Sequence, residues 1–180
     1  MLDQLLNLVK ENAQDLIVNN QAIPNQFNDA AIGEAGNAIH DQLSQAVNGG
    51  NLQDVLGIFG NSRNLTNNPL VGNIVSQLAG SLGGKFGVDG TQARNIAGKL
   101  IPQILGQLTD KTNNPNNSSF NINDIMGHLS GGGNKGIDFG KIVQQMQQGG
   151  GGVDFGNLAG QLSGGNKGGL GDVIGGFFKK

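Results

Sequence analysis

The stretch NLQDVLGIFG (residues 51–60) sets the pattern from which the fold of this chain can be predicted. Position one is Asn, which caps helices because its side-chain oxygen accepts hydrogen bonds from the free N–H groups of the first turn. Positions two, five and nine are apolar, and this spacing places them along one side of a helix. The closing glycine is typical of a helix end. The stretch therefore predicts a short helix with one apolar stripe.

The same pattern returns in the C-terminal part of the chain as NINDIMGHLS (121–130), DFGKIVQQMQ (138–147), DFGNLAGQLS (154–163) and GLGDVIGGFF (169–178). Helices this short are unstable alone in water, so each stripe needs a neighbour that buries it. The units can stack on each other, on the N-terminal helices or on another copy of the protein. A largely disordered tail is the alternative, because 19 of the 33 glycines follow residue 110.

Longer apolar periodicities predict further helices in the N-terminal part of the chain, at about 1–20, 29–47, 69–86 and 89–109. Pro69 suits a first helical turn, where a missing N–H costs least. Pro102 is expected to kink or divide the last of these helices. The stretch NSRNLTNN (61–68) is predicted to be a polar loop.

These elements predict an all-α fold, with a multihelical N-terminal bundle followed by short helical repeats punctuated by glycine. We expect an amphipathic helical domain at 1–110, a linker rich in Asn, Pro and Ser at 111–120, and the glycine-rich short-helix repeats at 121–180.

The segments NLQDVLGIFG, DFGNLAGQLSGG and GLGDVIGGFFKK, set in a glycine-rich helical chain, resemble the YidB-like family of bacterial proteins of unknown function. The likeness covers roughly residues 30–180. It implies a small multihelical bacterial protein, and it carries no activity or site residue that could be transferred to this chain.

Composition limits the function classes. The net charge is −2 and only 13% of residues are charged, whereas Asn and Gln number 24 and 16. The absence of Cys excludes disulfides and thiol catalysis, and the scattered Lys and Arg residues predict no nucleic-acid partner. No apolar run is long enough for a membrane span, and no secretory signal is recognised, so the expected location is cytoplasmic.

No motif predicts an enzyme, a cofactor or a metal. The stretch AGSLGGKF (79–86) departs from a phosphate-binding loop, since Ala79 replaces the first glycine and Phe86 replaces the Mg²⁺-binding hydroxyl. His40 and His128 lack the spacing of metal ligands and are expected on solvated helix faces. The acidic residues of the repeats suit helix caps better than calcium ligands, because each unit offers one acid, mostly at a cap position, and a calcium ion needs several oxygen ligands.

The leading hypothesis is therefore a non-catalytic structural or interaction protein that forms homo-oligomers through its short amphipathic helices. Low charge, an amide-rich surface and helices that need partners for burial all favour it. The predicted self-association residues are Phe139, Ile142, Met146, Phe155, Leu158, Leu162, Val173 and Phe177. The alternative is a peripheral membrane-binding protein anchored by residues 169–180, where two phenylalanines precede two lysines.

Overall fold

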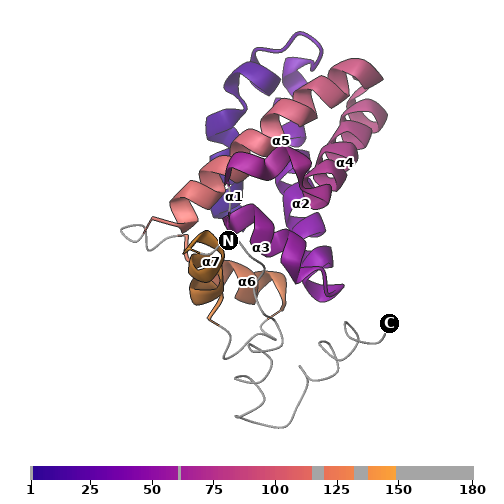
Figure 1. The fold of residues 1–180 in the computed structure, drawn as a ribbon. Coiled ribbons are helices and arrows are strands. Elements are labelled where there is room, and N and C mark those ends of the chain that lie inside the picture. The colour runs from indigo at the N-terminus through magenta and orange to yellow at the C-terminus, as the bar shows by residue number, and fades with distance from the viewer. Residues whose placement is uncertain (1, 61, 115–119, 132–137, 149–180) are drawn as a thin grey trace, which may run out of the picture.

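The computed structural model describes residues 2–60, 62–114, 120–131 and 138–148, and every regular element within these ranges is a helix (Figure 1). The α-helices are α1 (Leu2–Asn12), α2 (Asn28–Asn48), α3 (Leu52–Gly60), α4 (Pro69–Phe86), α5 (Gly90–Thr112), α6 (Ile122–Leu129) and α7 (Phe139–Gln148). A π-helical turn spans Gln14–Val18, and 3-10 turns span Asn25–Phe27 and Ser62–Asn67. The all-α prediction is confirmed for this part of the chain.

The long helices form a bundle, and the short ones cover one end of it. Helices α4 and α5 pack against each other, α2 packs on α4 and α1, and α5 also contacts α1 and α3. Helices α6 and α7 lie together beside α3, with α6 against α2 and α7 against α3 (Figure 1). Three helices that share the ten-residue pattern, α3, α6 and α7, therefore gather at the same end of the molecule.

Local capping explains where several helices begin and end. Asn68 Oδ1 accepts a hydrogen bond from Leu70 N at 2.9 Å, and Pro69 occupies the first turn of α4. Asp89 Oδ1 accepts hydrogen bonds from Thr91 N and Gln92 N at the start of α5. Helix α4 ends at Gly87, whose φ of +70° lies in the left-handed region that glycine adopts without strain. These capping signals lie within a few residues of each helix end, so they can be recognised from the sequence alone.

All seven α-helices contribute to one hydrophobic core, which therefore extends across the predicted boundary between the N-terminal domain and the repeats. Buried residues of α6 and α7 belong to the same core cluster as those of α1–α5. Helix α5 also continues to Thr112, and the Lys111 ammonium lies 5.6 Å from the centre of the Phe120 ring. The predicted linker at 111–120 therefore separates α5 from α6 along the sequence, but the described part of 121–180 is not a domain with its own core.

The single helix predicted at 1–20 is wrong in its second half. Regular α-helix ends at Asn12, and the chain then widens into a π-helical turn in which Val18 N donates to Ala13 O, five residues back. The change coincides with the side chain of Asn12, which is buried and donates to Leu8 O at 2.7 Å. A side chain that bonds the helix backbone in this way competes with the regular hydrogen-bond ladder.

Two other expectations are corrected. Of the two outcomes expected at Pro102, division of the helix is wrong, because α5 is one helix from Gly90 to Thr112, and the kink stays a prediction. The carbonyl that loses its partner to a proline is four residues back, and here that residue is Gly98, which is exposed to water. The stretch 61–68 is not simply a polar loop, because it contains the Ser62–Asn67 turn and buries Leu65 to 4% exposure.

Candidate functional site

The most specific arrangement of side chains in the described residues joins α6 to the start of α7. We call the surface of α3 and α6 against which α7 packs the α7 docking site, and its polar contact is Asn123. Asn123 Oδ1 accepts a hydrogen bond from Phe139 N at 2.7 Å, and Asn123 Nδ2 donates to Asp138 Oδ1 at 3.3 Å. One amide therefore recognises both the cap and the first residue of α7.

Asp138 is the N-terminal cap of α7. Its Oδ1 accepts a hydrogen bond from Lys141 N at 3.2 Å, as a capping carboxylate does. The hydrogen bond from the backbone of Lys141 lowers the pKa of the Asp138 carboxyl, and the Asn123 amide adds to the effect. The carboxylate is thus used to start a helix, which is the role that the pattern predicts for position one.

Phe139 and Gly140 explain why the cap is followed by these two residues. The Phe139 side chain is only 2% exposed and belongs to the shared core. A Cβ atom built on Gly140 would lie 3.7 Å from Ile122 Cγ2 and 3.2 Å from Asp138 Oδ1. Glycine therefore leaves room for the capping carboxylate of Asp138, while Phe139 fills the core beside it. The three residues Asp-Phe-Gly act as a docking motif.

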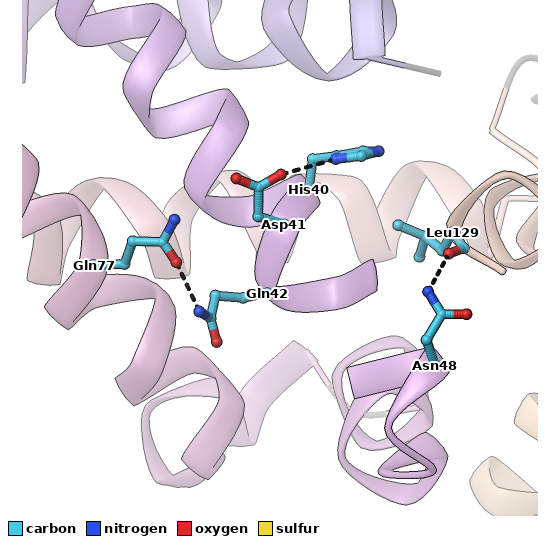
Figure 2. A network of polar contacts seen from close by, with 6 residues as sticks. All are labelled: His40, Asp41, Gln42, Asn48, Gln77 and Leu129. Atoms are coloured by element: carbon cyan, nitrogen blue, oxygen red, sulfur yellow. Dashed lines mark hydrogen bonds and ion pairs between the residues drawn. The ribbon is translucent and has the colours of Figure 1, made fainter. Parts of the chain in front are cut away.

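The partner helix α6 is itself held by an amide. Asn48, the last residue of α2, donates from Nδ2 to the backbone oxygen of Leu129 at 3.2 Å (Figure 2). In the same view, Gln42 Nε2 donates to Gln77 Oε1 at 2.7 Å and ties α2 to α4. Three amide side chains, those of Asn48, Gln42 and Gln77, thus connect helices.

Side chains from elsewhere in the chain also bond the carbonyl groups at the carboxyl end of α3. Asn113 Nδ2 donates to Phe59 O at 2.8 Å, and Thr109 Oγ1 donates to Ile58 O at 3.1 Å. The last carbonyls of a helix have no partner within it, so these side chains of α5 and its C-terminal end satisfy groups that burial would otherwise leave unpaired. Composition alone predicts a polar surface and did not reveal this internal use.

The structure changes the assignment of two predicted self-association residues. Phe139 and Ile142 are 2% and 3% exposed, so within the single chain they lie in its hydrophobic core. Met146 lies in α7, but its side chain is outside the described part of the structure. The remaining predicted residues, which also lie outside the described residues, are Phe155, Leu158, Leu162, Val173 and Phe177.

Lys85 belongs to the stretch 79–86 that was compared with a phosphate-binding loop. It lies on the helix α4, and its ammonium contacts Glu34 Oε1 at 2.5 Å. The hydrogen bond from Lys85 lowers the pKa of Glu34, and one from Ser81 adds to the effect, while partial burial opposes both. Glu34 is therefore a partner of α4, and the two helices are linked by an ion pair.

His40 lies next to an acidic residue of its own helix. His40 Nδ1 lies 3.3 Å from Asp41 Oδ1 on the solvent side of α2 (Figure 2). Among the residues that the structure describes, no three His, Cys, Asp or Glu side chains are placed together to hold a metal ion. Likewise, none of the helices in these ranges is both long enough and apolar enough to cross a membrane.

Comparisons with models of protein families, with curated proteins and with solved structures found no match for this chain. The resemblance to the YidB-like family therefore stays a prediction based on the recurring motif.

Proposed function

We propose that this chain is a non-catalytic interaction protein that self-associates through its short, glycine-punctuated helices. The observation that supports the proposal is the way α6 and α7 use their stripes. Ile122, Ile125 and Leu129 of α6 are buried, as are Phe139 and Ile142 of α7. Each unit is thus a docking element whose apolar side is covered by another helix, because a helix of this length is not stable without such cover.

Two further copies of the pattern need the same cover. Residues 154–163 and 169–178 carry the stripes Phe155, Leu158 and Leu162, and Leu170, Val173 and Phe177. Among the side chains that the structure describes, most Leu, Ile, Val, Phe and Met residues are buried, and the others, such as Phe27, Val75 and Phe86, are partly buried against the core. We infer that the two stripes pack against the corresponding stripes of a second copy. The low net charge, −2, opposes this association only weakly.

The test is the absolute mass of the full-length protein by light scattering, over a range of concentrations. We expect a discrete oligomer for the parent chain. The double substitution Leu158→Asp with Leu162→Asp places two charges on one stripe and should give a monomer. The matched control, Gln161→Asp with Ser163→Asp, adds the same charges beside the stripe and should remain an oligomer. A parent chain that is monomeric at every concentration contradicts the proposal.

The choice of variant follows from the fold. A chain that ends after Asn114 would lose the whole C-terminal region, but it would also lose α6 and α7, which cover α2 and α3. Its behaviour would mix the loss of assembly with damage to the core. Point substitutions in 154–163 leave the described helices intact, so a change of mass reports the stripe alone.

Membrane-surface binding through residues 169–180 is the alternative function, proposed from the sequence Phe177-Phe178-Lys179-Lys180. Flotation with vesicles that contain anionic lipid separates it from self-association. A monomeric chain that floats with vesicles, and no longer floats after Phe177→Ser with Phe178→Ser, would favour the membrane function. An oligomer that does not float favours the first proposal.

A further inference from the structure

We propose that residues 154–163 are a second, interchangeable occupant of the α7 docking site, able to replace residues 138–148 within the same chain. The proposal goes beyond self-association and does not depend on it. It starts from the observation that Asp138, Phe139 and Gly140 each make a separate contact in that site. The chain contains the same three residues in the same order once more, as Asp154-Phe155-Gly156.

The contacts of the site depend on features that both units share. Asn123 Nδ2 donates to the carboxylate of the cap, and Asn123 Oδ1 accepts from the next backbone N–H. The α7 docking site therefore recognises an Asp that is followed by any residue with a backbone N–H. The ring of Phe139 is buried at the second position, and another Phe would fill the same space. At the third position a Cβ atom would lie 3.2 Å from Asp138 Oδ1, which is closer than an ordinary contact, so glycine is favoured after this cap. Asp154, Phe155 and Gly156 satisfy all three requirements.

The rest of the stripe matches in character but is a weaker fit. Leu158 takes the place of the buried Ile142, with the same number of carbon atoms. Ala159 takes the place of Val143, which is 3% exposed, so the second unit leaves a small void there. Gly160 in place of Gln144 also weakens the helix. These differences favour residues 138–148, which occupy the site in the structure, over residues 154–163.

The connection permits the exchange. Helix α6 ends at Leu129 and α7 begins at Phe139, whereas the second unit begins sixteen residues further on, at Phe155. The free energy of loop closure grows only with the logarithm of loop length, so the longer connection adds a modest cost. A replacement within the chain also avoids the loss of translational freedom that binding a second copy requires.

The unit at 169–178 provides an internal contrast. Its first three residues are Gly169, Leu170 and Gly171. It offers no carboxylate to Asn123 and no ring for the position of Phe139. This unit should not enter the α7 docking site, although it has the same apolar spacing.

Fluorescence gives a direct test, because the chain contains no Trp and no Tyr. Phe155→Trp in the full-length protein places a single indole in the second unit, and Phe177→Trp places one in the contrasting unit. When Phe139→Asp is added to remove the resident occupant, the indole at position 155 should emit at shorter wavelength and resist quenching by acrylamide. The indole at position 177 should not respond. An unchanged spectrum at position 155 overturns the proposal.

Thermal unfolding provides a second test that needs no indole. In the parent chain, at a concentration at which light scattering shows a monomer, Phe155→Asp should lower Tm by less than about 1 °C, because the resident unit holds the site. In the Phe139→Asp background, the same change should lower Tm by about 5 °C or more, since both occupants are then lost. Effects that simply add, or a Phe139→Asp chain that is equally unfolded with and without Phe155, overturn the proposal. The milder Phe139→Ala serves as a second background.

Concentration separates exchange within the chain from exchange between copies. The response of the indole at position 155 should be the same at every protein concentration that light scattering shows to be monomeric. A response that grows with concentration overturns replacement within the chain. If self-association fails while the two tests above succeed, the docking inference stands without the proposed function.

Discussion

At the scale of single residues, paired amides hold α1 to α5. Asn12 Nδ2 donates to Gln107 Oε1 at 3.0 Å, and Gln107 Nε2 donates to Asn12 Oδ1 at 2.6 Å. Asn12 is 7% exposed and is one of the two buried polar side chains in the described core. Its Nδ2 also donates to Leu8 O, so the amide is fully engaged. This half-buried pair favours one placement of α1 on α5, because another register would leave the buried amide of Asn12 unpaired.

Asn12→Ala should therefore lower the free energy of unfolding by about 1–3 kcal/mol, since the Gln107 amide would lose its partner in a largely apolar setting. Urea titration followed by circular dichroism measures the change. Asn7→Ala, at an exposed position of the same helix, is the control and should be close to neutral. The double variant Asn12→Leu with Gln107→Leu should recover part of the loss. Equal effects of Asn12→Ala and Asn7→Ala would show that the amide pair contributes nothing specific.

At the scale of elements, α4 shows how a helix tolerates many glycines. Gly72, Gly80 and Gly84 are exposed, and a Cβ atom built on any of them would find nothing within 4 Å. The helix is nevertheless formed over all of Pro69–Phe86, because Leu70, Ile74 and Leu78 are buried in the core together with Leu82. Tertiary burial thus outweighs the weak propensity that the sequence predicts for this helix.

Gly80→Ala should consequently raise the free energy of unfolding by about 0.5–1 kcal/mol, because alanine loses less backbone entropy in a helix and fits here without contact. Gly87→Ala is the matched contrast. The φ of +70° at Gly87 is unfavourable for any residue with a Cβ, so this change should lower stability by about 1–2 kcal/mol. Thermal unfolding of the two variants measures both effects. The same sign for both changes would contradict this account of α4.

At the scale of the whole molecule, the short helices complete the core. Seven large apolar side chains of α6 and α7 are buried with those of the bundle, namely Ile122, Ile125, Met126, Leu129, Phe139, Ile142 and Val143. The core of the α1–α5 bundle is therefore complete only when α6 and α7 pack on α2 and α3. The pair in turn is too short to be stable without the bundle.

A chain that ends after Asn114 should lose stability on the order of a few kcal/mol, and its exposed apolar surface should bind a hydrophobic dye. A chain that ends after Gln148 keeps α7 and should unfold close to the parent. Urea midpoints and dye fluorescence of the two truncated chains give the comparison. Equal midpoints for the shorter and the longer chain would mean that α6 and α7 add nothing to the core.

The sequence by itself determined the helical class and the position of most helices, because periodicity, caps and glycine stops act over a few neighbouring residues. Pro69 and Asn68 mark the start of α4, and Asn121 marks the start of α6, where its Oδ1 accepts from Asn123 N. The same local pattern placed the start of α7 correctly, directly after the Asp138 cap.

Only the tertiary structure decided what each stripe packs against. The spacing of Phe139 and Ile142 predicts an apolar surface, but whether their own chain or another copy buries it depends on α3 and α6, which come from distant parts of the sequence. The break after Asn12 and the burial of Leu65 were missed for the same reason. A stripe specifies that burial must occur, and the arrangement of the other helices specifies where, because burial is a property of contacts between residues far apart along the chain.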